Sequence, residues 1–465
     1  MFEDIEFIEI AVIPNSISRL NIDLLPIPSK FDKDFELHRK NVNKAKKPFD
    51  SLTGEKFNKL SNMVYAYKFL KTMLLSVGYK VSTNATLKIH ELLHRYVSDR
   101  TNYTVFCNCE LPGAMLYDII KTFPDCNWLA SSYLESTGAT DHTLLQDTYK
   151  LYEQNKDRWI MGGPLSLVYE TNKVGGTSKA VETIEAGDAS NAVEASNAGE
   201  TSKAIEASEP SRAIEAIEAS EPSRVVEASE ASETVEVVEV GKTGGASEAS
   251  NTPDLTNAMG GNLISGDVTD VVVVKAIAKI VHTRIPGGVR LYTSDAGFNI
   301  DKDYDTQEEQ TMMVNYGQVL SGLVTLAPGG MLITKQYMFN HPFNRSLIAL
   351  LSTMFDRLLI VKPLTSRPMN SEIYLVGIGA RPISPETIEY MYSRLQYKYD
   401  YKEFIAPLCA ISEDTERSIF HATNVIHGQQ IRYIRDAMKI TSKDYDACKI
   451  RSRTLSNELF NKLFM

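Results

Sequence analysis

The sequence predicts an α/β fold in which a mostly parallel sheet carries helices on both faces. Segments typical of strands alternate with helical segments of ten or more residues, and that alternation is the pattern of parallel sheets. A chain of 465 residues with 43% hydrophobic residues is also long enough for two or three domains with cores of their own. The five cysteines are sparse and odd in number, which favours reduced thiols in a cytoplasmic protein over a disulfide framework.

Residues 1–80 are expected to form an N-terminal helical extension. Apolar residues recur at three- and four-residue intervals through 57–77, which predicts one amphipathic helix. The stretch before it, HRKNVNKAKK at 38–47, is basic and is a solvated loop or a patch that binds RNA. The acidic start MFEDIEFIEI does not resemble a signal peptide, and no run of eighteen apolar residues predicts a membrane span.

Residues 81–172 and 255–382 are expected to form the α/β domain. Its first part has a predicted helix at 84–97, a strand at 104–109 and a turn at 110–113 that enters a second helix. Its second part has predicted helices at 270–284, 311–326 and 344–355, and predicted strands at 289–295, 329–338, 357–363 and 372–379. Residues 383–465 lack repeated strand signals and are expected to form a helical C-terminal extension.

The segment 173–254 is a low-complexity insertion that we expect to be disordered. It contains AIEASEPSR at 204–212 and again at 216–224, and it has no aromatic residue. Its 17 acidic and 6 basic residues give it a net charge of −11, so the other 383 residues carry about +1 of the total of −10. Such a composition cannot bury enough apolar surface to offset its chain entropy. Its acidity opposes nucleic-acid binding and leaves recruitment of a protein partner as the alternative role.

The residues 90–94 fit the HExxH pattern, in which two histidines one helical turn apart bind zinc and the glutamate acts as a base. Arg95, Tyr96 and Val97 follow, so the continuation found in one large group of zinc peptidases is absent. The alternative is an amphipathic helix with Leu92 and Leu93 turned inward. We favour the helix, and we predict no metal site.

Polar residues at strand ends are the stronger candidates for chemistry. In an open parallel sheet, ligands bind beyond the carboxyl ends of the strands. Asp295 follows one predicted strand, Lys335 lies near the end of another, and Glu372 opens a third. The turn from Glu110 to Gly113 follows a fourth, so a lysine, carboxylates and a backbone-lined turn are expected around one crevice.

The stretch 289–377 resembles the FtsJ/RrmJ-like ribose 2′-O-methyltransferases, most closely the cap methyltransferases and the FtsJ-domain proteins of large cytoplasmic DNA viruses. The words that carry the resemblance are SDAGFNI, GQVLSGLVTLAPGGMLITK and KPLTSRPMNSEIYLV, with NATLKIHELL, FCNCELPGAML and LISGDVTD upstream. The resemblance covers about 85–170 and 258–378. It implies a Rossmann-like methyltransferase sheet that uses S-adenosylmethionine.

The resemblance also implies a catalytic tetrad of Lys88, Asp295, Lys335 and Glu372. Lys335 is the expected general base that takes the proton of a ribose hydroxyl, while the two carboxylates orient the amines and the hydroxyl. No metal is needed, because the leaving group is a neutral thioether and alignment supplies much of the rate.

For the cofactor, the resemblance implies contacts from Glu110, Pro112, Gly113, Asp267, Val268 and Asp295. Asp267 is the expected acceptor for the adenine amino group. The acidic residue that usually opens the family's loop is Cys107 here, and the second loop glycine is Ala114. These departures leave open weaker binding, a shift of the role to Glu110, or dependence on a partner subunit.

The expected substrate is RNA, most plausibly the first or second nucleotide of capped mRNA, in the cytoplasm, in a virus factory or in the virion of a large DNA virus. Aromatic residues able to stack a methylated guanine are Phe298, Tyr337, Phe339 and Phe343. The acidic insertion or the helical extensions are the expected places for a protein partner. The alternative function is an inactive RNA-binding or scaffold subunit that keeps the methyltransferase fold.

Overall fold

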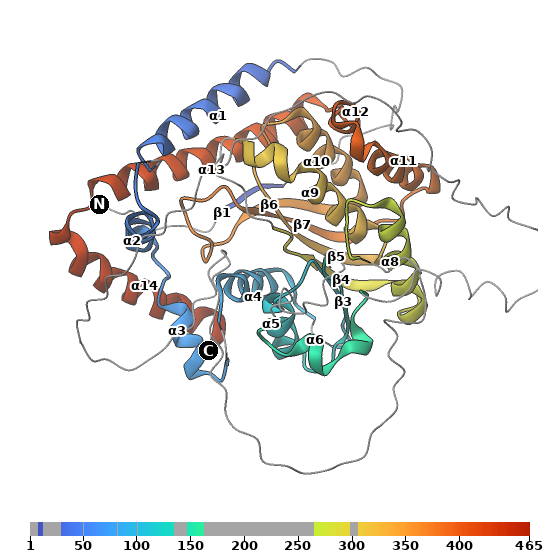
Figure 1. Ribbon diagram of the computed structural model, residues 1–465, viewed down its shortest axis with the longest axis horizontal. Helices are drawn as coiled ribbons and strands as arrows, with labels where there is room; N and C mark the ends of the chain where they lie inside the picture. The colour runs from blue at the N-terminus through green and yellow to red at the C-terminus, as the bar shows by residue number, and fades with distance from the viewer. Residues whose placement is uncertain are drawn as a thin grey trace, which may run out of the picture. The chain divides into compact units, whose positions relative to one another are not determined.

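A computed structural model describes residues 8–12, 29–49, 51–80, 82–99, 101–133, 147–161, 265–297 and 306–465 (Figure 1). All of these residues belong to one compact unit, formed by residues 1–169 and 227–465. The insertion 173–254, with its predicted disorder, and Phe298 lie outside the described residues. None of the helices described is both long and apolar enough to cross a membrane.

One sheet of seven strands organises the α/β domain. The strands are β1 (Ile8–Val12), β2 (Thr104–Asn108), β3 (Asn127–Ala130), β4 (Val289–Ser294), β5 (Leu326–Gln336), β6 (Phe355–Lys362) and β7 (Ile373–Ala380). Their order across the sheet is β1-β6-β7-β5-β4-β2-β3. Strands β2 to β5 pair in parallel, and β7 runs antiparallel to both β5 and β6. Five strands therefore share one direction, which confirms the predicted mostly parallel sheet.

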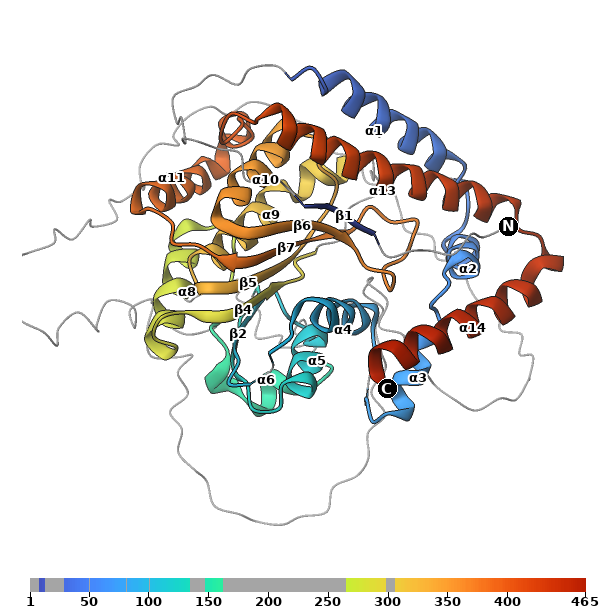
Figure 2. The ribbon, with the colours of Figure 1, turned by 180° about the vertical axis from the view of Figure 1, so that it is seen from behind.

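Helices cover both faces of this sheet, as predicted (Figures 1 and 2). On one face pack α8 (Val271–Arg284), α9 (Gln307–Leu323), α10 (Pro342–Met354) and α11 (Pro385–Gln396). On the other pack α4 (Asn84–Tyr96) and α5 (Ala114–Thr122), with the short α6 (Leu151–Gln154) beside them. Successive strand residues alternate between the two cores, because their side chains point to opposite faces. In β5, Leu332 joins the first core while Met331 and Ile333 join the second.

The N-terminal extension differs from the sequence prediction in three ways. Residues 8–12 form the strand β1, which pairs antiparallel with β6 in a region expected to be helical. The basic stretch 38–47 is mostly part of α1 (Asp32–Lys46), so its interpretation as a loop is wrong. The single helix predicted for 57–77 is also wrong, because α2 (Gly54–Val64) ends and α3 (Leu70–Ser76) begins within it.

The break between α2 and α3 has a packing cause. The four consecutive residues from Val64 to Tyr67 are all buried, and one face of a helix cannot bury four neighbours in sequence. Tyr65 is extended, with a ψ of 107°, and its hydroxyl donates a hydrogen bond to the Thr365 carbonyl at 2.7 Å. A tertiary contact therefore replaces a helical turn at this position.

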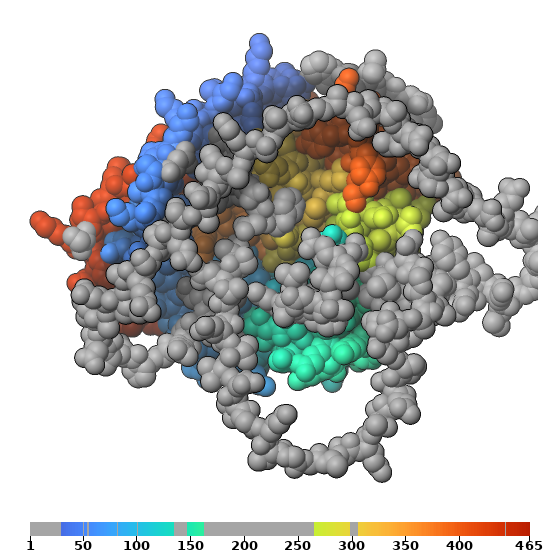
Figure 3. All heavy atoms as spheres, viewed as in Figure 1, coloured from blue at the N-terminus to red at the C-terminus, as the bar shows by residue number. Residues whose placement is uncertain are grey.

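The C-terminal residues are helical, as predicted. They form α11, then α12 (Tyr401–Phe404), α13 (Glu413–Lys439) and α14 (Tyr445–Phe464). Helix α13 packs against α1 and α2, and α14 packs against α2, α3 and α4. The N-terminal helices, in blue, and the C-terminal helices, in red, therefore lie together along one side of the molecule in Figure 3.

Candidate active site

The carboxyl ends of β4 and β5 lie beside the start of β7. Thr334 of β5 pairs with Ser294 of β4, and Lys335 pairs with Tyr374 of β7. Because β7 runs antiparallel to β5, the residue that precedes it lies at the same edge as the ends of the parallel strands. This topology brings Asp295, Lys335 and Glu372 to one edge of the sheet.

Lys88 reaches this edge from α4. The helix begins with a capping box between Thr83 and Thr86, which fixes where its first turn starts. The Lys88 Nζ donates to Glu372 Oε1 at 2.7 Å, and the side chains of Lys88 and Glu372 are only 3% and 6% exposed. Burial alone raises the pKa of a carboxyl group, but the ammonium groups of Lys88, Lys335 and Lys362 outweigh it and hold the pKa of Glu372 well below its usual value. Glu372 is therefore a buried anion among cations.

Lys335 and Asp295 form the second pair. The Lys335 Nζ lies 3.0 Å from Asp295 Oδ1 and also donates to the Asp295 carbonyl oxygen at 3.2 Å. Tyr374 connects the two pairs, because its hydroxyl donates to Asp295 Oδ1 at 3.3 Å and its ring centroid lies 5.9 Å from the Lys88 Nζ. All four residues named from the sequence thus belong to one cluster.

Lys362, at the end of β6, is a member of this cluster that the sequence analysis did not name. Its Nζ donates to the Glu372 carbonyl oxygen at 2.6 Å and to the carbonyl and side-chain oxygens of Asn370. Burial lowers the pKa of Lys362 to about 7. Its position at a strand end in the word KPLTSRP was the signal that could have found it.

Glu91 gives the HELLH pattern a structural role. Its carboxylate accepts hydrogen bonds from the backbone N–H groups of Leu364 and Thr365, each at 3.0 Å, and from the Thr365 hydroxyl at 2.9 Å. These bonds hold the segment that also carries Ser366, whose hydroxyl donates to Glu372 Oε1 at 3.1 Å. Glu91 therefore acts through the loop beside the tetrad.

The first histidine of that pattern is also engaged in packing. His90 Nδ1 lies 3.1 Å from Asp118 Oδ1, Nε2 lies 3.0 Å from the Leu463 carbonyl oxygen, and its ring stacks on Phe464. Within the described ranges, no group of three or more His, Cys, Asp or Glu residues is placed to hold a metal ion. Leu92 and Leu93 are fully buried, as the helical interpretation predicts, but Glu91 is fully buried as well, so the expectation that the polar residues face outward is wrong for Glu91.

Glu110 begins the loop between β2 and α5. Its Oε1 accepts from the Leu116 N–H at 2.7 Å, which satisfies one of the donors at the start of α5. Its Oε2 is buried and has no hydrogen-bond partner among the described residues. Burial raises the pKa of Glu110 to about 8. A buried oxygen without a partner is suited to accept a hydrogen bond from a donor group of a bound molecule.

Gly113, in the same loop, is favoured by both its conformation and its packing. Gly113 has a φ of +101°, and a Cβ atom there would lie 3.3 Å from Leu151 Cδ1, so a glycine is favoured on both counts. Pro112 precedes it. Cys107, which replaces the family's acidic residue, is fully buried in the core formed with α4 and α5. It is therefore a packing residue here.

Cys109 connects the loop to the tetrad. Its thiol lies within electrostatic range of Lys335, Asp295, Glu110 and Asp267, although burial is the main reason that its pKa is raised to about 12. The end of β2 therefore lies near the loop, the acidic motif and the tetrad.

Asp267 is already hydrogen bonded within the protein. Its Oδ1 accepts from the Thr269 N–H at 2.9 Å and the Thr269 hydroxyl at 2.7 Å, and its Oδ2 accepts from Lys398 Nζ at 2.9 Å. Burial opposes ionisation, yet the Lys398 and Thr269 bonds lower the pKa of Asp267. Ionised carboxylate oxygens accept more than one bond each, so an adenine amino group can be added to this set. Val268 is buried beside it, and its carbonyl oxygen lies 2.0 Å from where a Cβ of Gly317 would be.

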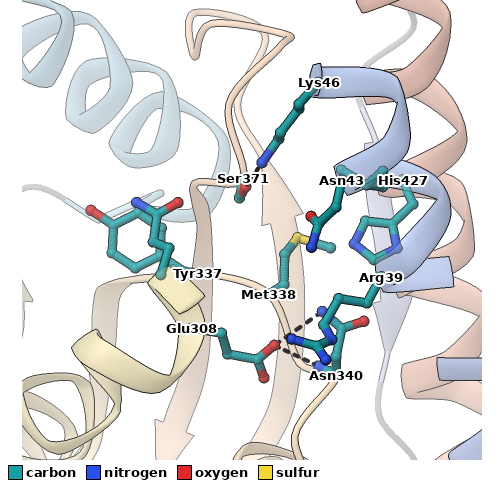
Figure 4. A pocket seen from close by; sticks show the side chains of 11 residues that line it. Arg39, Asn43, Lys46, Glu308, Tyr337, Met338, Asn340, Ser371 and His427 are labelled. Carbon is teal, nitrogen blue, oxygen red and sulfur yellow. Dashed lines mark hydrogen bonds between the residues drawn. The ribbon is translucent and has the colours of Figure 1, made fainter. Parts of the chain in front are cut away.

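A pocket lies on the α1 side of the tetrad (Figure 4). Arg39 and Lys46 enter it from the basic stretch, and Lys46 Nζ donates to the hydroxyl of Ser371, the residue before Glu372, at 3.4 Å. Tyr337 lines the pocket, whereas Phe339 and Phe343 are buried in the core and cannot stack a ligand base. Of the aromatic residues that were named for guanine stacking, Tyr337 is the described one that borders a cavity.

The described residues form a mostly parallel sheet with charged side chains at the carboxyl ends of its strands. Residues 240–380 match the family of FtsJ-like methyltransferases. This part of the chain is therefore similar to an FtsJ-like methyltransferase domain.

Two groups of curated proteins are similar to the chain. A protein of African swine fever virus, named "Probable methyltransferase EP424R", is 29% identical over 432 residues, which are 89% of this chain and 78% of the relative. The Danio rerio "Cap-specific mRNA (nucleoside-2'-O-)-methyltransferase 1" is 32% identical over 158 residues, or 32% of this chain and 19% of the relative. The protein of the same name from Trypanosoma brucei brucei is 34% identical over 24% of this chain and 30% of its own length.

Proposed function

We propose that this methyltransferase transfers a methyl group to a ribose 2′ oxygen of RNA, at a nucleotide next to the 5′ cap of mRNA. The observation that carries the proposal is the buried cluster of Lys88, Asp295, Lys335 and Glu372. An inactive scaffold has no need for two ion pairs of this kind connected by Tyr374, since a buried ion pair is often less stabilising than apolar residues of similar volume. The cluster therefore favours an enzyme over a binding subunit.

The cluster provides the acid–base chemistry that such a transfer needs. A ribose hydroxyl is a poor nucleophile near neutral pH, so a base must take its proton as it reacts. Lys335 is the assigned base, because it is the lysine held by Asp295 beside the loop and the acidic motif. Lys88 and Lys362 are two more cations around Glu372.

The loop and the acidic motif are assigned to S-adenosylmethionine, which supplies the electrophilic methyl group when bound. Glu110 Oε2, which is buried without a hydrogen-bond partner among the described residues, is assigned to accept from the ammonium group, and Pro112 and Gly113 are assigned to the loop beside it. Asp267 and Val268 are assigned to the adenine side. Asp295 lies between these residues and the base, so it orients Lys335 relative to both.

RNA and the cap are supported by charge and by the relatives. Arg39 and Lys46 bring positive charge to the small pocket next to Glu372, which Glu308 also lines, and Arg39 pairs there with Glu309. The names of the relatives from Danio rerio and Trypanosoma brucei brucei state a cap-specific mRNA substrate for those proteins. The African swine fever virus relative supports action in a virus factory or virion in the cytoplasm.

The test is transfer of a labelled methyl group to short RNAs with and without a 5′ cap. Nuclease digestion and mass spectrometry then identify the methylated nucleoside. The expected product is a 2′-O-methylated first or second nucleotide of the capped RNA, and a capped RNA with 2′-deoxyribose at both positions should accept no label. Label on a base, or equal transfer to the deoxyribose control, would contradict the proposed reaction.

A further inference from the structure

A basic groove lies outside the part of the chain that matches the methyltransferase family, except at its rim. Its accessible volume is about 510 Å³. We use the name basic groove for its lining, which consists of Lys59, Asn62, Met63, Tyr65, Lys68, Phe69, Lys71, Thr72, Asn84, Arg367, Tyr445 and Lys449. Five of these described lining residues are Lys or Arg, and none is Asp or Glu. A groove with this lining is suited to a polyanion.

Helices from both ends of the chain build this groove. Lys59 lies on α2, Lys71 on α3 and Lys449 on α14, and α14 packs against both of the others (Figures 1 and 2). Lys59 and Lys449 are exposed to solvent. Tyr445, at the first turn of α14, is 42% exposed, so its ring can stack on a base. The groove therefore combines spaced positive charges with an accessible aromatic ring.

The groove borders the tetrad through two shared elements. Asn84 starts α4, and Lys88 follows one helical turn later on the same helix. Arg367 follows Ser366, whose hydroxyl donates to Glu372 Oε1 at 3.1 Å. The hydroxyl group of Tyr65, which lines the groove, lies within electrostatic range of both Arg367 and Glu372. The groove and the tetrad are therefore neighbours on α4 and on the loop 364–367.

We propose that the basic groove binds the backbone phosphates of single-stranded RNA next to the methylated nucleotide. This assignment rests on the proposed function, which makes RNA the substrate. Lysines neutralise phosphates and release condensed counterions, which gives affinity without sequence preference. Exposed lysines and one partly exposed tyrosine resemble the stacking and charge pattern of single-strand binding surfaces more than the apolar centre of a protein interface.

The test compares two charge-reversal variants on the same helices. The groove variant is Lys59→Glu/Lys449→Glu, and the matched control is Lys56→Glu/Lys462→Glu, which changes the net charge equally at exposed positions outside the groove. Binding of a fluorescein-labelled RNA of about ten nucleotides is measured by anisotropy over a range of salt concentrations. Thermal unfolding of both variants tests whether they fold. If the charge-reversal variant does not fold, the neutral variant Lys59→Gln/Lys449→Gln replaces it in the binding experiment.

The groove variant should bind RNA at least about tenfold more weakly than the control, and its salt slope should fall by about 1.4 for two lost phosphate contacts. Equal affinity of the two variants overturns the assignment, even if the groove then binds an acidic protein segment. RNA binding is measured without the cofactor. The result therefore tests the groove independently of the proposed methyl transfer. Loss of RNA affinity in the groove variant supports the groove even if the wild type methylates no RNA.

Discussion

The tetrad and the basic groove use lysine in opposite ways. In the tetrad, Lys88 is 3% exposed and lies 2.7 Å from a carboxylate oxygen, and Lys335 is 7% exposed and lies 3.0 Å from another. In the basic groove, Lys59 and Lys449 are exposed and no carboxylate is part of the described lining. Burial beside a carboxylate fixes an amine in one geometry, whereas exposure leaves it as a screened positive charge. The first arrangement suits proton transfer and the second suits attraction of a polyanion.

The largest effect that separates the two regions should come from Lys335→Met. Loss of a general base lowers the rate of the chemical step by about 10²- to 10⁴-fold. RNA affinity should stay within about twofold of wild type, because the groove lysines supply it. Single-turnover methyl transfer and RNA anisotropy measure the two quantities.

Lys402→Met, at an exposed lysine of α12, is the matched control for Lys335→Met and should leave both quantities unchanged. If the Lys335 variant kept its rate but lost RNA affinity, the division of roles between tetrad and groove would be wrong.

The next largest effect should be the cost of removing the tetrad's central anion. Glu372→Gln leaves Lys88 and Lys362 buried without a countercharge, which costs about 3–5 kcal/mol of unfolding free energy. The folded pKa of Glu372 lies below the ordinary 4.5, so its stabilising contribution is present above pH 4.5 and is lost as pH falls through the folded value. Urea unfolding of wild type and variant at pH 7 and at pH 4 measures both effects.

The difference in unfolding free energy between wild type and Glu372→Gln should be smaller at pH 4 than at pH 7. The groove variant Lys59→Glu/Lys449→Glu should differ from wild type by less than about 1 kcal/mol, because exposed charges contribute little. A larger loss there than in Glu372→Gln would reverse the comparison.

A smaller effect that reaches both regions should follow from Glu91→Gln. The amide side chain keeps an acceptor but loses the charge that holds the backbone of Leu364 and Thr365, at a cost of about 1–3 kcal/mol. This loop carries Ser366 toward Glu372 and Arg367 toward the groove, so methylation rate and RNA affinity should fall together. Steady-state kinetics and anisotropy test this.

Zinc analysis of the wild type provides an independent check on Glu91. One equivalent of zinc that a His90→Ala/His94→Ala variant lost would instead favour the metal interpretation of HELLH.

The smallest effect concerns the cofactor loop and depends on pH. The pKa of Glu110 is raised to about 8, so its carboxyl group is neutral below that pH and ionised above it. Affinity for S-adenosylmethionine should therefore rise by about tenfold from pH 6 to pH 7.5, a range in which the ammonium group of the ligand stays mostly protonated. Glu110→Gln should bind with the weaker affinity at both pH values. Calorimetric titration measures the dissociation constants, and a wild-type affinity independent of pH would contradict the assignment.

The same shift has a consequence for folding. Between pH 4.5 and about 8 the folded carboxyl of Glu110 holds a proton that the unfolded chain has released. Its contribution to stability is therefore present below pH 4.5 and lost as pH rises through about 8. Glu110→Gln should make the free energy of unfolding less dependent on pH in that window.

The regular elements around the site could be predicted because their signals are local. The strand 289–295 and the helix 270–284 were predicted from spacing and correspond to β4 (Val289–Ser294) and α8 (Val271–Arg284). The predicted helix 57–77 failed because the burial of Tyr65 to Tyr67 against distant residues outweighed the local periodicity. Strand β1 was missed for a related reason, since an edge strand of five residues depends on its pairing with β6.

The site residues also fall into those with a local sequence signal and those that depend on tertiary contacts. The residue types and their places at strand ends identified Asp295, Lys335 and Glu372 from the sequence, because the chain direction of a strand is a local property. The sequence did not show that Lys362 holds Glu372 from β6, or that Glu91 serves a loop 273 residues away. Both contacts depend on strand order and helix packing.

The sequence by itself determined the alternation of helices and strands, the residues able to do acid–base chemistry, and the charge of each segment. Tertiary structure decided which charged groups meet, because burial and pairing depend on residues far apart in the chain. The tertiary structure buries Lys88 and Glu372 as an ion pair. It also assembles the basic groove from helices at opposite ends of the chain. An amine becomes a base or a phosphate contact through its surroundings, since desolvation and nearby charges set its protonation.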